Sequence, residues 1–208
     1  MALTVSPPRI GIFGGAFDPP HLAHAALAKS AIEQLGLDEL RVIPTGEAWH
    51  KDHCLTVAQH RLTMTQLAFA ELAKVVIDER ELRRTGPSYS IDTLRELMIE
   101  QPSATFFLLL GEDQAGKFST WREWRAIAEH AVLVVARRSS AITCSISKAY
   151  QDFRTTLPVD RVRDLHFAPR TVSATEIRAL AQARTGIAHL VGLPVARYIE
   201  DHHLYQNH

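Results

Sequence analysis

The 208-residue chain carries 23 basic and 23 acidic residues, so its formal net charge is zero when the histidines are neutral. This balance argues against a large nucleic-acid or membrane-binding surface and favours small-molecule partners. A content of 46% hydrophobic and 22% charged residues is typical of a globular protein and excludes fibrous and disordered classes. We expect residues 1–208 to form a single domain, because this length suits one well-buried core.

The cysteines and the apolar runs bear on the compartment. Cys54 and Cys144 lie far apart and form no Cys-x-x-Cys pair, so neither a disulfide framework nor a structural zinc site is expected. Residues 1–9 lack the long apolar core of a signal peptide, and no apolar run reaches the length of a membrane span. We therefore expect a cytoplasmic protein that binds neither membranes nor nucleic acid.

Short apolar runs alternate with amphipathic stretches, which is the pattern of parallel strands joined by crossover helices. Strands are expected at 9–13, 40–43, 75–78, 105–110, 131–136 and 162–167. Helices are expected over 22–35, with Gly36 as the end signal, over 57–72, from a cap at Ser90, from about Trp121, over 174–185 and around 195–200. Residues 139–160 show no sustained period. The expected fold class is α/β, a Rossmann-like doubly wound parallel sheet with crossover helices.

Ligands of open parallel sheets bind at the carboxyl ends of the strands, so the segments that follow the strands are the expected binding segments. These segments are 14–24, 45–51, 79–90, 111–121, Arg137 with Arg138, and the residues before Ser173. Glycines, histidines and hydroxyl side chains gather in several of them.

The segment 10–24 reads I-G-I-F-G-G-A-F-D-P-P-H-L-A-H and combines a strand, a tight loop and a helix start. Gly14 and Gly15 let the backbone approach a ligand closely, and the two prolines suit the entrance of a helix. His21 and His24 lie at i and i+3, so both project from one side of the first helical turn. Imidazoles beside the N–H groups of a helix N-terminus favour a phosphate site, with two ordinary histidines as the alternative.

Two other phosphate-binding motifs fit less well. The glycines at 11, 14 and 15 do not follow the G-x-G-x-x-G order of a dinucleotide-binding turn. The segment 111–118, G-E-D-Q-A-G-K-F, nearly matches the phosphate loop of nucleoside triphosphatases, but Phe118 replaces the magnesium-binding Ser or Thr. Glu112 and Asp113 would also repel phosphate, and Asp113 is better suited to accept hydrogen bonds from sugar hydroxyls.

The segment that starts at Ser173 forms a second candidate phosphate site. Ser173-Ala174-Thr175-Glu176 has the spacing of a capping box, and Arg178 follows within the next turn. A simple cap, a solvent-facing hydroxyl and an ordinary helical cation are the alternative interpretation. Hydroxyls, N–H groups and an arginine at a helix start can instead hold phosphate. Two such sites in one α/β domain indicate a nucleoside triphosphate that bridges them.

The segment 14–24 resembles the G-G-x-F-D-P-x-H-x-G-H signature of the nucleotidyltransferase superfamily that shares the histidine motif of class I aminoacyl-tRNA synthetases. S-A-T-E-I-R at 173–178 resembles its second signature, S-x-T-x-I-R. The segments 78–90, 111–113, 119–121 and 135–138 are similar to those of bacterial nicotinate-nucleotide adenylyltransferases. The sequence departs from the family pattern at Ala16, Ala23 and Ala48-Trp49, where the family often has Thr, Gly and Pro-Pro.

The resemblance implies transfer of AMP from ATP to nicotinate mononucleotide, which yields nicotinate adenine dinucleotide and pyrophosphate in the pathway to NAD. It implies Mg²⁺ carried by the ATP phosphates without a protein ligand. Two alternatives stay open: a related enzyme with another acceptor, such as nicotinamide mononucleotide or phosphopantetheine, and a nucleotide sensor without catalytic activity. The oligomeric state is not predicted.

The resemblance also implies residue roles. His21 and His24 would contact the ATP phosphates, with His24 nearer the transferring phosphorus, while Lys51 and Arg178 stabilise charge. The ATP-binding set is Gly14, Gly15, Ala16, Phe17, Gly111, Asp113, Ser173 and Thr175. The acceptor-binding set is Ser90 near the nicotinate carboxylate, Trp121 stacked on the pyridine ring, and Arg138 at a phosphate.

Overall fold

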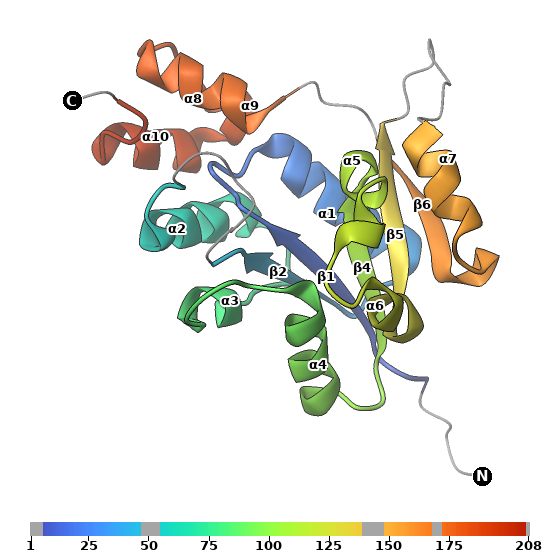
Figure 1. Ribbon diagram of the computed structural model, residues 1–208. Helices are drawn as coiled ribbons and strands as arrows, with labels where there is room; N and C mark the ends of the chain where they lie inside the picture. The colour runs from blue at the N-terminus through green and yellow to red at the C-terminus, as the bar shows by residue number, and fades with distance from the viewer. Residues whose placement is uncertain (1–5, 47–54, 139–147, 168–171, 207–208) are drawn as a thin grey trace.

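The computed structural model describes residues 6–46, 55–138, 148–167 and 172–206, and it places one six-stranded sheet at the centre of the protein (Figure 1). The strand order is β3-β2-β1-β4-β5-β6, and all neighbouring strands are parallel. The strands are β1 Arg9–Gly15, β2 Glu39–Pro44, β3 Val75–Ile77, β4 Thr105–Gly111, β5 Ala131–Arg138 and β6 Val162–Phe167. The expected α/β doubly wound parallel sheet is confirmed.

The strand order places a topological switch point between β1 and β4. The chain builds the sheet outwards from β1 to β3, returns to the centre, and then builds it in the other direction from β4 to β6. Arg9 of β1 aligns with Thr105 of β4, so the two strands run side by side in the same direction. The segments after β1 and β4 therefore leave the sheet where open α/β folds bind their ligands.

Helices cover both faces of the sheet, and a further group lies beyond one end of it (Figure 1). They are α1 Leu22–Leu35, α2 Ala58–Phe69, α3 Arg80–Arg83, α4 Ser90–Glu100, α5 Glu112–Ala115, α6 Trp124–His130, α7 Lys148–Thr155, α8 Ala174–Gln182, α9 Ala188–Val191 and α10 Leu193–Asp201. Short 3-10 turns occur at η1 Phe118–Thr120 and η2 Val159–Arg161. Within the described residues, no helix is long and apolar enough to cross a membrane.

Alternate residues of β4 serve two separate cores. Phe106 and Leu108 pack with Leu94 of α4 on one face, whereas Phe107 packs with Ala28 of α1 on the other. This is the period of two expected for a strand that is buried on both sides. The sheet is thereby covered on both faces, and its carboxyl edge is left to carry the site.

A third core joins the carboxyl-terminal helices to α2. Met64 of α2 packs with Ile177 of α8 and Ile199 of α10, and all three side chains are buried. Figure 1 shows α8, α9 and α10 gathered beside α2, away from α4 and α6. This packing brings the second signature segment, at the start of α8, to the same end of the molecule as the first.

Several boundaries differ from those expected from the sequence. Tyr89 caps α4 and makes no side-chain cap bond, so Ser90 is the first helical residue and its predicted capping role was wrong. The helix expected from Trp121 begins at Trp124, because Trp121 is extended after η1 and Glu123 adopts the left-handed conformation, with φ 50°. Arg138 still belongs to β5 and does not follow it, and α8 ends at Gln182.

The helices that were not predicted are short or polar. Three of them, α3, α5 and α9, have four residues each, which is too few to show a helical period. The fourth, α7, lies in the stretch 139–160 that received no assignment, and residues 139–147 of that stretch lie outside the described residues.

Candidate active site

His21 and His24 lie together at the start of α1, as their spacing predicts. The backbone at His21 is extended, with φ −143° and ψ 169°, and it caps a helix whose first residue is Leu22. The two imidazole rings stack with their centroids 3.7 Å apart and their planes 16° apart. The edge of Phe17 packs against His24 with a centroid distance of 5.2 Å. Both rings are thus held at the carboxyl end of β1.

A single hydrogen bond sets the tautomer of His24. The backbone N–H of His21 donates to Nδ1 of His24 at 3.2 Å, so Nδ1 carries no proton. Burial, and secondly the neighbouring His21, lowers the pKa of His24 well below its ordinary value. The ring is therefore neutral at pH 7, with its proton on Nε2, and can donate that proton in a hydrogen bond to a phosphate oxygen.

We expect His24 to stay neutral in the ligand-free protein when the pH falls below about 6.5, the ordinary value for histidine. Below that pH the unfolded chain takes up a proton at this ring and the folded protein does not. The free energy of unfolding therefore decreases as the pH is lowered from about 6.5 towards the pKa of the folded state. NMR titration of the ring signal, assigned with a His24→Gln variant, checks this, and an apparent pKa at or above 6.5 would contradict it.

Arg178 joins the two signature segments by a bond to Asp18, 160 residues earlier in the chain. Its Nη1 donates to the backbone oxygen of Asp18 at 2.8 Å, and its Nη2 donates to the hydroxyl of Thr175 at 3.3 Å. The hydroxyl of Ser173 accepts from the backbone N–H of Glu176 at 3.1 Å, so Ser173 does cap α8. The simpler interpretation of Ser173 as a helix cap holds, and Arg178 also contacts the first segment.

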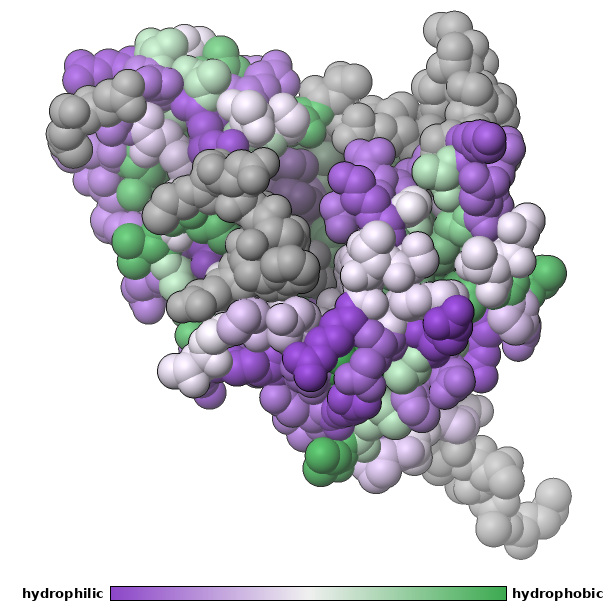
Figure 2. Space-filling model, in the orientation of Figure 1, coloured by the Kyte–Doolittle hydropathy of each residue, from purple (hydrophilic) through white to green (hydrophobic). Residues whose placement is uncertain are grey.

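The end of β4 contributes the third part of this region. Gly111 aligns with Ala136 of β5 and caps α5, whose first turn contains Asp113, an exposed carboxylate. Figure 2 shows the surface receding between α5 and the layer of α8 to α10. A nucleotide at this recess would meet the ends of both central strands.

Gly14 and Gly15 end β1 at this edge. Among the described residues, a Cβ atom at Gly14 would have no neighbour within 4 Å, and Gly14 itself is exposed. A Cβ at Gly15 would come within 3.0 Å of the Phe17 ring, and Phe17 itself adopts φ 47°. Gly15 is therefore required by the packing of Phe17, whereas Gly14 leaves the edge of the sheet open to a ligand.

The two predicted acceptor segments also come together. The guanidinium of Arg122 lies 4.8 Å from the centre of the Tyr89 ring, next to Ser90. A few residues away, Nη2 of Arg95 in α4 pairs with Glu123 at 2.6 Å. The half-buried ring of Trp121 packs at 5.5 Å from Phe118, which is fully buried. The start of α4 and the segment around Trp121 therefore form one surface.

Two predicted residues cannot be placed by their side chains. Lys51 lies outside the described residues, as do Ala48 and Trp49. Arg138 aligns with Phe167 in the sheet, but its side chain lies outside the description. In the described part of the chain, no group of three or more His, Cys, Asp or Glu residues could hold a metal ion.

The structure also reveals buried charges that the sequence interpretation did not single out. Asp18 is 4% exposed, and its Oδ1 accepts from the hydroxyl of Tyr205 at 2.7 Å. Arg61 is 2% exposed and donates to the backbone oxygens of Ala16, Thr45 and Thr56 at 2.8 to 2.9 Å. Asp18 stands inside the first signature, which was the available signal, whereas nothing in its spacing distinguishes Arg61 from a surface arginine.

Comparison with known proteins identifies the family. Residues 12–180 match the family model described as cytidylyltransferase-like. A protein of Albidiferax ferrireducens, named probable nicotinate-nucleotide adenylyltransferase, is 54% identical over 198 residues, which cover 95% of this chain and 98% of that protein. The chain belongs to the nicotinate-nucleotide adenylyltransferase family. A protein of the same name from Methylibium petroleiphilum is 41% identical and covers 95% of this chain and 92% of its own length.

Solved structures agree with this adenylyltransferase fold. Plasmodium falciparum nicotinic acid mononucleotide adenylyltransferase complexed with NaAD superimposes with a TM-score of 0.77 at 19% identity, over 95% of this chain and 97% of that chain. The same protein complexed with APC gives a TM-score of 0.75. The likeness confirms the Rossmann-like arrangement. The family is one of ATP-using nucleotidyltransferases, which generally need a divalent metal ion.

Proposed function

We propose that this adenylyltransferase transfers AMP from ATP to nicotinate mononucleotide, and that the two signature segments bind the triphosphate between them. The observation that carries this proposal is the hydrogen bond from Arg178 to the Asp18 backbone, which joins the segments beside the histidine pair. The proposal includes a single domain and a cytoplasmic location.

The chemistry needs little help from a general base. A phosphate monoester has a second pKa of about 6, so the acceptor phosphate is largely dianionic at neutral pH. One of its oxygens attacks the α-phosphorus of ATP, a new P–O bond forms, and the bond to the leaving pyrophosphate breaks. The protein mainly holds the two anions in line and stabilises the charge that develops on the leaving group.

The described residues can hold the two anions and stabilise the charge on the leaving group. Nε2–H of His24 would donate to the α-phosphate, with His21 beside it, because the two rings form one stacked unit. Arg178, Ser173 and Thr175 would contact the phosphates from the α8 side. Lys51 would add positive charge, as the family resemblance implies.

The remaining ATP-binding residues line the ends of the central strands. Gly14 and Gly15 end β1, and Gly111 ends β4, so their backbone would lie along the nucleotide. Ala16 and Phe17 follow β1, and Asp113 would accept hydrogen bonds from the ribose. Mg²⁺ would travel on the ATP phosphates and supply charge neutralisation there.

The acceptor would lie on the surface formed by the start of α4 and the segment around Trp121. The positive end of the α4 dipole, at Ser90, favours a carboxylate over an amide. The preference for the acid would follow from N–H donors without a nearby acceptor. Arg138 would meet a phosphate group.

Trp121→Ala is expected to raise the KM for nicotinate mononucleotide by about 10-fold or more, because stacking on a flat ring contributes about 1–3 kcal/mol. The KM for ATP should stay within about twofold, since the ring lies in the acceptor segment. Steady-state kinetics with each substrate varied in turn checks this. Trp121→Phe keeps an aromatic face and should recover most of the affinity, and selective loss of ATP affinity would contradict the stacking role.

A panel of acceptors tests the function itself. Pyrophosphate release is measured with ATP and, in separate reactions, nicotinate mononucleotide, nicotinamide mononucleotide and phosphopantetheine. The highest kcat/KM is expected with nicotinate mononucleotide. Turnover with another acceptor alone would refute the acceptor assignment, and tight ATP binding without turnover for any acceptor would identify a nucleotide sensor.

A further inference from the structure

Tyr205, which follows α10, contacts the first signature segment, residues 14–24. The hydroxyl of Tyr205 donates to Oδ1 of Asp18 at 2.7 Å across 187 residues of sequence. Oδ2 of the same carboxylate accepts from the backbone N–H of Thr56 at 3.1 Å. Each oxygen of the Asp18 carboxylate therefore accepts one of these hydrogen bonds.

Asp18 in turn holds Arg178 through its own backbone. The carbonyl of Asp18 accepts from Nη1 of Arg178 at 2.8 Å, so the position of this peptide unit sets the position of the guanidinium. Its other nitrogen, Nη2, is oriented by Thr175. A shift of Asp18 would consequently move the cation that we place at the ATP phosphates.

The burial of the Asp18 carboxylate favours keeping its two hydrogen bonds in place. Asp18 is 4% exposed, and a buried charge that loses a hydrogen-bond donor is costly because water cannot replace it. Arg61 supplies a nearby positive charge, but its guanidinium donates to backbone oxygens and not to this carboxylate. Burial and the charge of Asp18 raise the pKa of Tyr205, so the phenol keeps the proton that it donates.

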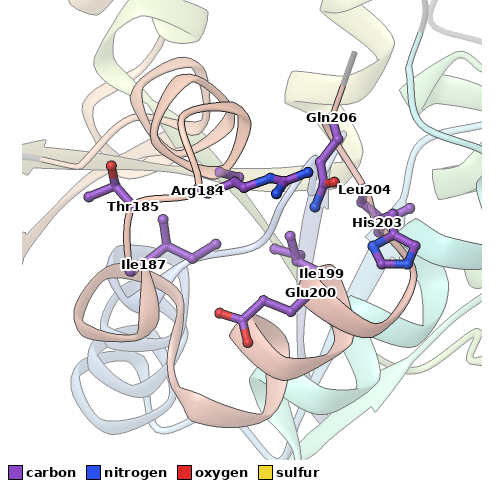
Figure 3. A pocket seen from close by; sticks show the side chains of 10 residues that line it. Arg184, Thr185, Ile187, Ile199, Glu200, His203, Leu204 and Gln206 are labelled. Atoms are coloured by element: carbon purple, nitrogen blue, oxygen red, sulfur yellow. The ribbon is translucent and has the colours of Figure 1, made fainter. Parts of the chain in front are cut away.

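The backbone around Tyr205, the residue that contacts Asp18, contains two residues in the left-handed region. Tyr205 adopts φ 65° and His203 adopts φ 50°, both in the left-handed region that side chains seldom occupy. Leu204 and Gln206, the residues on either side of Tyr205, line a cavity of about 620 Å³ near the end of α8 (Figure 3). Leu204 and Gln206 therefore line the cavity, whereas the hydroxyl of Tyr205 contacts Asp18.

We propose that Tyr205 is a positioning residue for AMP transfer, which acts through Asp18 to hold Arg178 at the ATP phosphates. This inference rests on the proposed function, because its kinetic test measures AMP transfer to nicotinate mononucleotide. It assigns the carboxyl-terminal segment a part in the reaction although Tyr205 itself touches no reacting atom.

The test compares Tyr205→Phe, which removes one hydroxyl and keeps the ring, with Gln206→Ala, a control in the same segment. Tyr205→Phe should lower kcat/KM for ATP on the order of 10-fold, the size expected for a lost hydrogen bond to a buried charge, while the KM for the acceptor stays within about twofold. Gln206→Ala should match the wild type. A variant whose ATP and acceptor parameters change equally, or not at all, would overturn the inference.

A double-mutant cycle isolates the route through Arg178. In an Arg178→Ala background, Tyr205→Phe should have no further effect, because the group that it positions is gone. Losses that multiply in the double variant would show that Tyr205 acts by another route. Thermal unfolding of each variant confirms that it is folded.

A second arm separates this inference from the proposed function. The dissociation constant of a non-hydrolysable ATP analogue needs no acceptor, so it can be measured even when the acceptor assignment fails. Tyr205→Phe should weaken analogue binding by about fivefold or more, and Gln206→Ala should leave it unchanged. Equal analogue affinities of the wild type and Tyr205→Phe would overturn the inference.

Discussion

His24→Ala is expected to lower turnover by about 100-fold or more while leaving the fold intact. Removing one preorganised donor to the charge that develops in a transition state typically costs that much. We propose Nε2–H of His24 as such a donor, because the His21 backbone N–H and the stacked ring fix its tautomer and its direction before substrate binds. Turnover is measured as pyrophosphate release at saturating ATP and acceptor.

The chain offers a matched control for this change. His189→Ala removes an exposed imidazole in α9 and should leave turnover at the wild-type level. Thermal unfolding of both variants separates a loss of chemistry from a loss of folded protein. A His24→Ala variant with wild-type turnover would remove this residue from the catalytic set.

Arg178→Ala is expected to produce the second large effect, a loss of turnover on the order of 100-fold. The guanidinium contacts Asp18 and Thr175 at once and carries the positive charge proposed to face the phosphates. Arg178→Lys keeps the charge but loses the planar fork, so it should recover only part of the activity. Steady-state kinetics with ATP varied measures both.

Arg184 provides the control for Arg178. It is exposed and lines the cavity beyond the end of α8, so Arg184→Ala should keep the wild-type kcat and KM. If Arg178→Ala behaved like Arg184→Ala, the second signature segment would have no part in phosphate binding.

The sheet could be predicted from the sequence because its signals are local. The strands β4 and β5 contain continuous apolar runs, and in the central strands alternate residues supply two cores, as Phe106 and Phe107 do. The left-handed Gly36, with φ 57°, ends α1 where its position predicts. The spacing of His21 and His24 also predicts that they lie on one side of the first turn, where their rings are found stacked.

Contacts between residues far apart in the chain could not be predicted from the sequence. Asp18, Arg61 and Tyr205 meet only in the folded chain, and no spacing between them indicates this. Gly46 is another such case, because a Cβ atom there would lie 2.2 Å from the backbone oxygen of Glu81. The catalytic, ATP-binding and acceptor-binding roles assigned from the sequence all stay predictions, as does the single domain. For Lys51 and Arg138 the side chains also lie outside the described part of the chain.

Labelled ATP tests the central claim most directly. The enzyme is incubated with nicotinate mononucleotide and either ATP labelled at its α-phosphorus or ATP labelled at its γ-phosphorus, and the products are separated. AMP transfer predicts that the α-label appears in nicotinate adenine dinucleotide and that the γ-label appears in pyrophosphate. Transfer of the γ-label to the acceptor, or retention of both labels in ATP, would contradict the account.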